Sequence, residues 1–259
     1  MSKNFELMQQ AGLDHQIRAS RKPDEPTLQV ASREGNGKSQ IRANGAPLNL
    51  DKVTREESLK LVQRVFLQGG VEPPRTVVFA GINHQNGCSQ ICAQTADILA
   101  RNISGPVCLV EANLRTPALP AFFGTTNHYG LTDALLKEDP IRNYVKQVSV
   151  SNLWLLSSGS MPPGNAVVPN SDPMKSRFAE LRKEFEFVLI DAPPLSEYSD
   201  AVGLAQLADG LVLVLEANST RREAALRVTE NLNAAQVRVL GAVLNKRTFP
   251  IPGPLYSRL

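Results

Sequence analysis

The sequence predicts an α/β fold in which a doubly wound, mostly parallel sheet carries helices on both of its faces. Three observations support this fold class: short runs rich in valine, leucine and isoleucine recur along the chain, helical stretches separate several of these runs, and small or polar residues follow where the runs end. Apolar strands that alternate with amphipathic helices are typical of βαβ units, whose parallel sheets are buried on both faces.

The expected strands are short and similar in composition. Six runs fit a buried strand: "TVVFAG", "PVCLVEA", "NLWLLSSG", "FEFVLIDAPP", "GLVLVLEA" and "VRVLGAVLN". The first begins at Thr76 and the last ends at Asn245. Their β-branched and leucine side chains suit the pleated, half-enclosed surface of a sheet.

Four stretches are expected to be helical. In "REESLKLVQRVFLQGG", the residues Leu59, Val62 and Phe66 share one face, and a glycine pair ends the stretch. The other three stretches are residues 88–102, residues 173–184 preceded by Ser171 and Asp172, and about residues 221–235, where Thr220 and Glu223 fit a capping box.

The chain is expected to consist of a flexible arm, residues 1–50, and one domain, residues 51–259, which ends in a short tail. Residues 18–49 are polar, charged and rich in turn-forming residues, so they have too few large apolar side chains to pack a core. Near the start, Phe5 and Met8, with Leu13 as a further candidate, fit the apolar stripe of a short amphipathic helix that docks on a partner or a membrane surface. A frayed terminus is the alternative.

Composition excludes several classes of protein. No apolar run approaches the roughly 18 residues that span a bilayer, and "MSKNFELMQQ" lacks the apolar core of a signal peptide, so we expect a cytoplasmic protein. The three cysteines, Cys88, Cys92 and Cys108, are odd in number and share no C-x-x-C spacing, which favours buried thiols over disulfides or a zinc site. A formal net charge of +3 gives no reason to expect a nucleic-acid partner.

The loop after the first strand has the outline of a phosphate-binding loop. Such loops follow G-x-x-x-x-G-K-[ST], in which glycines let backbone amides approach phosphate, the lysine neutralises charge and the hydroxyl binds magnesium. Here the letters from Asn83 are "NHQNGCS", with Gly87 and Ser89 at the second glycine and the hydroxyl. Gly81 lies one residue before the usual first glycine, and Cys88 replaces the lysine. Taken alone, the motif fits an ordinary strand-to-helix turn equally well.

Two other strand ends carry residues of the same kind. Asp191 ends "FVLID", as in a Walker B segment whose carboxylate holds magnesium directly or through water. Glu111, Asn113 and Arg115 follow the run "VCLV". Because ligands bind at the carboxyl ends of parallel strands, three such ends in this order favour a nucleotide site over unrelated turns.

The region from about residue 51 to residue 250 resembles the cytoplasmic bacterial tyrosine kinases (BY-kinases) of capsule and exopolysaccharide export. These kinases are relatives of the deviant-Walker P-loop ATPases that partition plasmids and position the division site. The family's D-x-D-x-R segment is matched by "EANLR", which runs from Glu111 to Arg115. Its middle segments are similar to "GLTDALL" and "LLSSGSMPPGNAVV", and its Walker B segment continues into "SDAVGLAQLADG". The resemblance implies a P-loop fold of the deviant-Walker type.

The resemblance also implies a set of site residues. The residues that contact the nucleotide would be Gly87, Cys88, Ser89, Gln90 and Asn245, of which Asn245 would contact the adenine. The magnesium ligands would be Ser89, Glu111 and Asp191. The catalytic residues would be Glu111, Asn113, Arg115 and Asp191.

Departures from the family pattern fall on these same positions. In the family, the second acid of D-x-D assists deprotonation of the attacking tyrosine, whereas Asn113 is an amide that cannot accept a proton at neutral pH. Cys88 is either a neutral space-filler or a thiol whose pKa is lowered at a helix N-terminus, which would make it redox-sensitive. The ring-forming helix motif E-x-x-R-x-x-R appears only as "ESLKLVQR" from Glu57, and the tail keeps a single tyrosine, Tyr256.

These departures predict a degenerate kinase domain with weak or absent binding of ATP, ADP and Mg²⁺. We expect it to act as a regulatory or structural partner in exopolysaccharide or capsule biosynthesis and export, peripherally at the inner membrane. Its expected partners are a membrane-bound polysaccharide copolymerase or adaptor, or an active kinase paralogue, and a homo-oligomer is compatible with the altered helix motif. The alternative is an enzyme: a weak ATPase or protein-tyrosine kinase that such a partner activates. A partition-type ATPase fits the fold but not the segments "GLTDALL" and "PPGNAVV".

Overall fold

The computed structural model describes residues 52–67, 73–160 and 169–247. The predicted arm, residues 1–50, and the tail that carries Tyr256 lie outside these ranges, so both remain predictions. Within the described part of the chain, no helix is both long enough and apolar enough to cross a bilayer.

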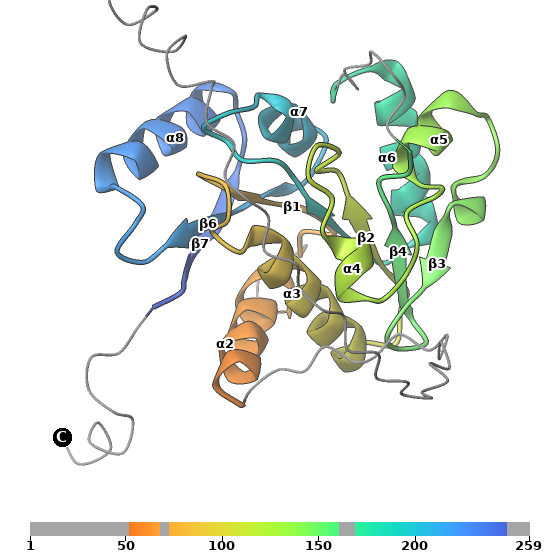
Figure 1. Ribbon diagram of the computed structural model, residues 1–259, viewed down its shortest axis with the longest axis horizontal. Helices are drawn as coiled ribbons and strands as arrows, with labels where there is room; N and C mark the ends of the chain where they lie inside the picture. Colours follow the sequence, from red (N-terminus) through yellow and green to blue (C-terminus); the bar gives the residue numbers. More distant parts are fainter. Residues whose placement is uncertain (1–51, 68–72, 161–168, 248–259) are drawn as a thin grey trace, which may run out of the picture. The chain divides into compact units, whose positions relative to one another are not determined.

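A seven-stranded sheet forms the centre of the described domain (Figure 1). Its strands are β1 (Thr76–Gly81), β2 (Val107–Glu111), β3 (Val145–Gln147), β4 (Leu153–Leu156), β5 (Phe187–Asp191), β6 (Gly210–Glu216) and β7 (Val239–Asn245). They lie in the order β3-β4-β2-β5-β1-β6-β7, and every neighbouring pair is parallel except β3 with β4. The six predicted strands are confirmed.

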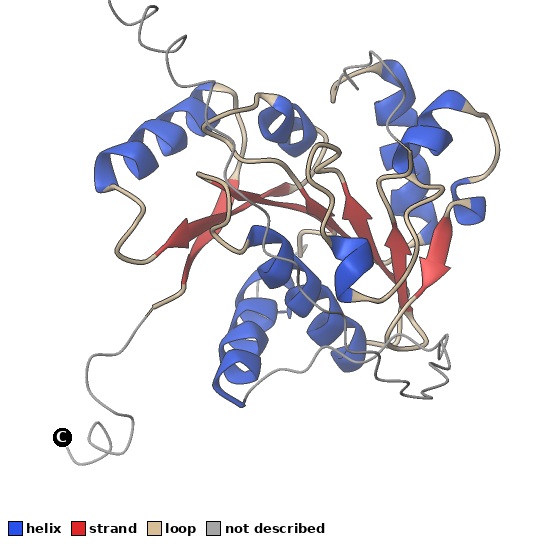
Figure 2. Cartoon of the chain, in the orientation of Figure 1, coloured by secondary structure: helices blue, strands red, loops and turns tan. Residues whose placement is uncertain are grey.

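Helices cover both faces of the sheet (Figure 2). They are α2 (Lys52–Val62), α3 (Cys88–Asn102), α4 (Leu119–Phe122), α5 (Leu131–Leu136), α6 (Asp172–Glu184), α7 (Asp200–Gln206) and α8 (Arg222–Ala234). Alternate residues of β1 point to opposite faces: Val77 and Phe79 pack with α2, α3 and α4, whereas Val78 and Ala80 pack with α5, α6, α7 and α8. The predicted doubly wound α/β fold is therefore confirmed.

Three of the predicted helices agree closely with the structure, but one predicted cap is wrong. Helix α3 spans the predicted range, and at the start of α6 the Ser171 side chain accepts a hydrogen bond from a backbone N–H three residues on. Helix α8 also forms where predicted, yet its N-cap is Arg221 and no side chain caps it. The Thr220 hydroxyl accepts a hydrogen bond from the N–H of Glu216 instead, at 2.9 Å, so it closes the turn after β6.

Helix α2 ends differently from the prediction, because its last residues continue into a π-helical turn, Gln63–Leu67. The predicted apolar face is confirmed at Val62 and Phe66, which are buried. On the exposed face, Glu57 and Lys60 form an ion pair of 2.7 Å within the helix. These two residues stand at the first two charged positions of the altered ring-forming motif.

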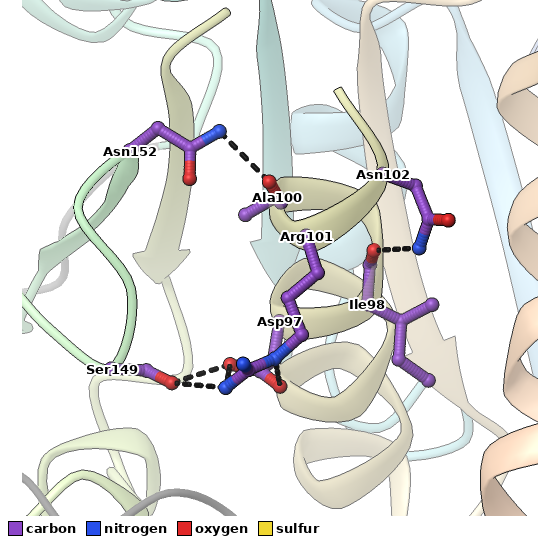
Figure 3. Close-up of polar contacts among 7 residues, drawn as sticks. All are labelled: Asp97, Ile98, Ala100, Arg101, Asn102, Ser149 and Asn152. Atoms are coloured by element: carbon purple, nitrogen blue, oxygen red, sulfur yellow. Dashed lines mark hydrogen bonds and ion pairs between the residues drawn. The ribbon is translucent and has the colours of Figure 1, made fainter. Parts of the chain in front are cut away.

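A polar network fastens the C-terminal half of α3 to the loop between β3 and β4 (Figure 3). The buried carboxylate of Asp97 accepts hydrogen bonds from Arg101 Nε at 2.8 Å and from the Ser149 hydroxyl at 2.5 Å. Asn152 donates its amide N–H to the carbonyl of Ala100 at 2.8 Å. Since this end of α3 is anchored, the opposite end is held at the carboxyl edge of the sheet, where the loop between β1 and α3 lies.

Candidate functional site

The loop between β1 and α3 lies at the carboxyl edge of the sheet, in the place that a phosphate loop occupies in doubly wound folds. Gly87, directly before α3, has a φ of 83°, and a side chain there would collide with the amide of Asn245. Asn86 is buried and donates its side-chain N–H to the carbonyl of Val214, at 2.9 Å, which ties the loop to β6. The loop is therefore shaped by neighbouring strands without a lysine of its own.

Cys88 and Ser89 open α3 on the side of Asp191. Both side chains lie beside the carboxylate, although neither makes a hydrogen bond of regular geometry with it. Cys88 is half-buried, and burial together with the charge of Asp191 raises the pKa of the thiol well above its ordinary value. This direction is opposite to the lowering that the redox-sensitive alternative requires, because desolvation and a carboxylate outweigh the helix dipole, and it agrees with a neutral, space-filling thiol. Gln90, which follows in α3, is exposed.

Glu111 and Asp191 form a buried acidic pair at the ends of neighbouring strands. They are in register between β2 and β5, and both residues are fully buried. Oε2 of Glu111 accepts the backbone N–H groups of Ala118 and Leu119, each at 2.8 Å. Within the described part of the chain, Oε1 of Glu111 and both carboxylate oxygens of Asp191 have no hydrogen-bond partner.

Burial governs the protonation of this pair. It raises the pKa of Glu111 well above its ordinary value, and the nearby charge of Asp191 raises it further. Burial also raises the pKa of Asp191 to about 6, against the opposing influence of the Ser89, Cys88 and Glu111 side chains. Two neighbouring buried carboxylates do not both ionise readily unless a cation lies between them, and without a cation one proton stays bound to the pair.

The unpartnered oxygens fit a hard divalent cation. Mg²⁺ prefers oxygen ligands in octahedral geometry and usually keeps several waters beside one or two carboxylates and substrate phosphates. Asp191, Glu111 and the Ser89 hydroxyl supply oxygens of this kind. Among the described residues, no group of three or more His, Cys, Asp and Glu could hold a metal ion. Water or phosphate oxygens would therefore have to complete the coordination.

Asn113, in the loop after β2, is turned toward Thr116. Its Oδ1 accepts the backbone N–H of Thr116 at 3.3 Å, and its Nδ2 donates to the Thr116 hydroxyl at 3.0 Å. These two bonds close a local turn of the kind that Asn and Asp form with their own backbone. The amide therefore has a structural role that the family resemblance does not predict.

Arg115 is engaged by the segment that follows β5. Its Nη2 lies 3.2 Å from the Asp200 carboxylate, and its guanidinium lies 4.2 Å from the centre of the Tyr198 ring. Beside them, His84 of the phosphate loop lies 2.9 Å from the carboxylate of Glu197. Sequence reasoning missed Glu197, Tyr198 and His84, and their only signal was a position after a strand end.

Asn245 and Lys246 contact the phosphate loop from the end of β7. Asn245 Nδ2 donates to the carbonyl of Asn86 at 2.8 Å, and Lys246 Nζ donates to the carbonyl of Gln85 at 2.5 Å. The sequence singled out Asn245 but not Lys246, although both belong to "GAVLNK". The structure thus brings part of the predicted set to one edge of the sheet: Gly87, Cys88, Ser89, Glu111, Asp191 and Asn245. In contrast, the side chains of Asn113 and Arg115 are engaged by other partners.

A comparison with characterised proteins finds a relative that matches most of the chain. The chain is 33% identical to the tyrosine-protein kinase YwqD of Bacillus subtilis (strain 168) over 217 residues, which cover 83% of this chain and 91% of YwqD. No family model matches the chain.

Solved structures share the fold. The kinase domain of the Escherichia coli tyrosine kinase ETK matches with a TM-score of 0.72 at 20% identity, over 83% of this chain and 87% of that domain. The septum site-determining protein MinD of Pyrococcus horikoshii OT3, solved with Mg-ADP, matches with a TM-score of 0.56 at 17% identity, over 71% of this chain and 76% of MinD. These likenesses confirm the predicted P-loop fold of the deviant-Walker type.

Proposed function

The chain belongs to the bacterial tyrosine-kinase family, and we propose that it is a member that binds Mg-nucleotide weakly and has lost efficient phosphoryl transfer. We further propose that it serves as a regulatory or structural partner in exopolysaccharide or capsule assembly. One observation carries the proposal: the buried acidic pair Glu111 and Asp191 keeps unpartnered oxygens, while Cys88 and Asn113 supply neither a lysine charge nor a base.

Several features support weak nucleotide binding. The N-terminus of the 15-residue helix α3 attracts phosphate through its free amides and its dipole. Asp191, Glu111 and Ser89 would hold magnesium, which when bound supplies the charge that neutralises nucleotide phosphates. The lost lysine contact is a charge-assisted hydrogen bond worth about 1.5 to 3 kcal/mol, so its absence should weaken binding roughly ten- to a hundredfold.

Phosphoryl transfer should suffer more than binding. Transfer depends on charges positioned around the transferring group, and a residue that accepts the proton of the attacking tyrosine hydroxyl assists it. Asn113 cannot accept that proton, and its amide is engaged by Thr116. Without both the lysine and the base, the rate should fall by several orders of magnitude.

The proposed partner is a membrane-bound polysaccharide copolymerase or adaptor, or an active kinase of the same family. The resemblance to kinases of capsule and exopolysaccharide export supports this choice. The ring-forming motif is altered, and its Glu57 and Lys60 pair with each other on an exposed helix face, so it gives less support for a ring of identical copies.

An enzyme is the second candidate function, and the intact acidic pair favours it. Magnesium-dependent transfer requires a carboxylate at the Walker B position, which Asp191 supplies. A weak ATPase or tyrosine kinase that becomes active on binding an adaptor would keep this pair for catalysis rather than for binding alone.

Titration calorimetry with Mg-ADP tests the proposed site. We expect a dissociation constant of tens of micromolar or weaker, and loss of measurable binding when EDTA removes the magnesium. The matched variant Ser89→Ala should weaken binding further, whereas Ser160→Ala, at an exposed serine in the loop after β4, should not. A sub-micromolar affinity, or an affinity that does not depend on magnesium, would reject this description of the site.

A further inference from the structure

Two consecutive residues at the end of β7 hold two consecutive carbonyls of the phosphate loop. Asn245 donates to the carbonyl of Asn86, and Lys246 donates to the carbonyl of Gln85. Gln85 and Lys246 both have left-handed backbones, with φ of 61° and 55°. Non-glycine residues adopt this region at a cost, so surrounding contacts must hold them there. We call this arrangement the β7 clasp, formed by Asn245 and Lys246 on Gln85 and Asn86.

The clasp sets the direction of backbone amides in the loop. In a trans peptide the C=O and the next N–H point in opposite directions, and the described chain has no cis peptide bond. Since the carbonyls of Gln85 and Asn86 point toward β7, the N–H groups of Asn86 and Gly87 point away from it. Backbone amides held in this way form the concave anion sites that phosphate loops use.

Lys246 also brings positive charge to a loop that lacks a lysine. Its ammonium group lies 3.2 Å from the carboxylate of Glu216 at the end of β6, and its side chain is 46% exposed. The chain has no lysine between Gly81 and Arg101. The ammonium group next to the loop therefore belongs to a residue that lies far from the loop in the sequence. An ammonium group has three donors, and the described contacts with Gln85 and Glu216 use two of them.

We propose that Lys246 is a positioning residue for phosphate binding: by holding the carbonyl of Gln85 it keeps the backbone amides of the loop turned toward the phosphate, and its ammonium group adds positive charge next to a loop that has no lysine. This proposal rests on the proposed nucleotide site, and it names Lys246 as the residue that orients the part of the site that recognises the phosphate end of the ligand. The ligand class is a nucleoside diphosphate or triphosphate, recognised through its phosphates rather than its base.

The test compares Lys246→Met, which keeps the apolar stem, with Lys246→Arg, which keeps the charge. Binding of Mg-ADP and of inorganic pyrophosphate is measured by competition with a fluorescent ADP analogue, at low and high salt. Lys246→Met should weaken both ligands about tenfold and reduce the salt dependence, and Lys246→Arg should restore most of the affinity. Lys146→Met is the matched control, because Lys146 also donates to a backbone carbonyl, that of Thr126, but on β3 at the opposite edge of the sheet.

Unchanged affinities in Lys246→Met would overturn the proposal. A loss of affinity for Mg-ADP but not for pyrophosphate would also overturn it, because Lys246 would then act on the nucleoside part of the ligand rather than on its phosphates. If wild type binds neither ligand, the proposed nucleotide site fails independently of Lys246. Hydrogen exchange of residues 83–90 then decides the role of Lys246 in the loop. Exchange that is faster in Lys246→Met than in wild type and Lys146→Met supports the positioning role, and equal exchange rejects it.

Discussion

Replacing Asp191 with asparagine is expected to stabilise the nucleotide-free protein at neutral pH, by on the order of 2 to 3 kcal/mol. Burial raises the pKa of Asp191 from its ordinary value of 3.8 to about 6. The folded state therefore disfavours the charged carboxylate, which has no hydrogen-bond partner among the described residues. Asparagine removes this charge and keeps the shape. The free energy of unfolding, measured by urea denaturation with EDTA present, gives the comparison.

The effect should depend on pH in a defined direction. Because the pKa of Asp191 is raised in the folded state, that state binds more protons than the unfolded chain between about pH 4 and pH 6. The free-energy cost of ionised Asp191 in the folded state therefore grows as the pH rises through this window. The gain in the free energy of unfolding of Asp191→Asn over wild type should be largest above pH 6 and vanish near pH 4. Glu138→Gln, at an exposed carboxylate, is the control and should show no such trend. If Asp191→Asn lowered the free energy of unfolding at every pH, this would contradict the description of Asp191 as a buried carboxylate whose charge destabilises the nucleotide-free protein.

Introducing the lysine and the aspartate of the family pattern should tighten nucleotide binding but give little kinase activity. Cys88→Lys combined with Asn113→Asp is expected to tighten Mg-ADP binding roughly ten- to a hundredfold, because the new ammonium group would lie beside Asp191 and the phosphate loop. The turn at Thr116 should survive, since the threonine hydroxyl can donate to an aspartate as readily as it accepts from Asn113. Calorimetry and a phosphotyrosine assay measure the two outcomes separately.

Cys88→Ala with Asn113→Asp is the matched control, because it changes the thiol without adding charge. It should bind Mg-ADP no more tightly than wild type. Kinase activity should stay low in the lysine-bearing variant, because the ring-forming motif from Glu57 remains altered. Full activity in that variant would show that the two substitutions alone account for the loss. Unchanged binding would contradict the attribution of weak nucleotide binding to the missing lysine.

The sequence predicts the central elements of this fold because those strands are apolar along their whole length. In β1, for example, the run from Thr76 to Gly81 is buried at every position, and this gives a clear pattern without alternation. Strand β3 is missed because its three residues include a lysine and a glutamine, and it forms only by pairing with β4. The short helices α4, α5 and α7 are missed for a similar reason, because tertiary contacts rather than periodicity stabilise them.

For the site, strand ends could be predicted but side-chain directions could not. Glu111 and Asp191 each end an apolar strand, and the carboxyl ends of parallel strands lie at one edge of the sheet, so the sequence could place both residues at that edge. That β2 and β5 are neighbours, with these two residues in register, is seen only in the structure. The pairing of Arg115 with Asp200 could not be predicted, because it depends on how the loop after β2 packs beside the first turn of α7. Lys246 shows the same limit, since a lysine after a strand end carries no signal that it will reach a loop about 160 residues earlier.

Incubation of the purified wild-type chain with Mg-ATP, followed by intact-mass and phosphotyrosine analysis, tests most directly whether this family member transfers phosphate. An active kinase of the family, treated in parallel, shows that the assay detects transfer. We predict that the mass of the wild-type chain stays unchanged, and that Tyr256 becomes labelled only when the active kinase is added. Stoichiometric phosphate on Tyr256 without any added kinase would contradict the loss of transfer and establish the chain as an enzyme.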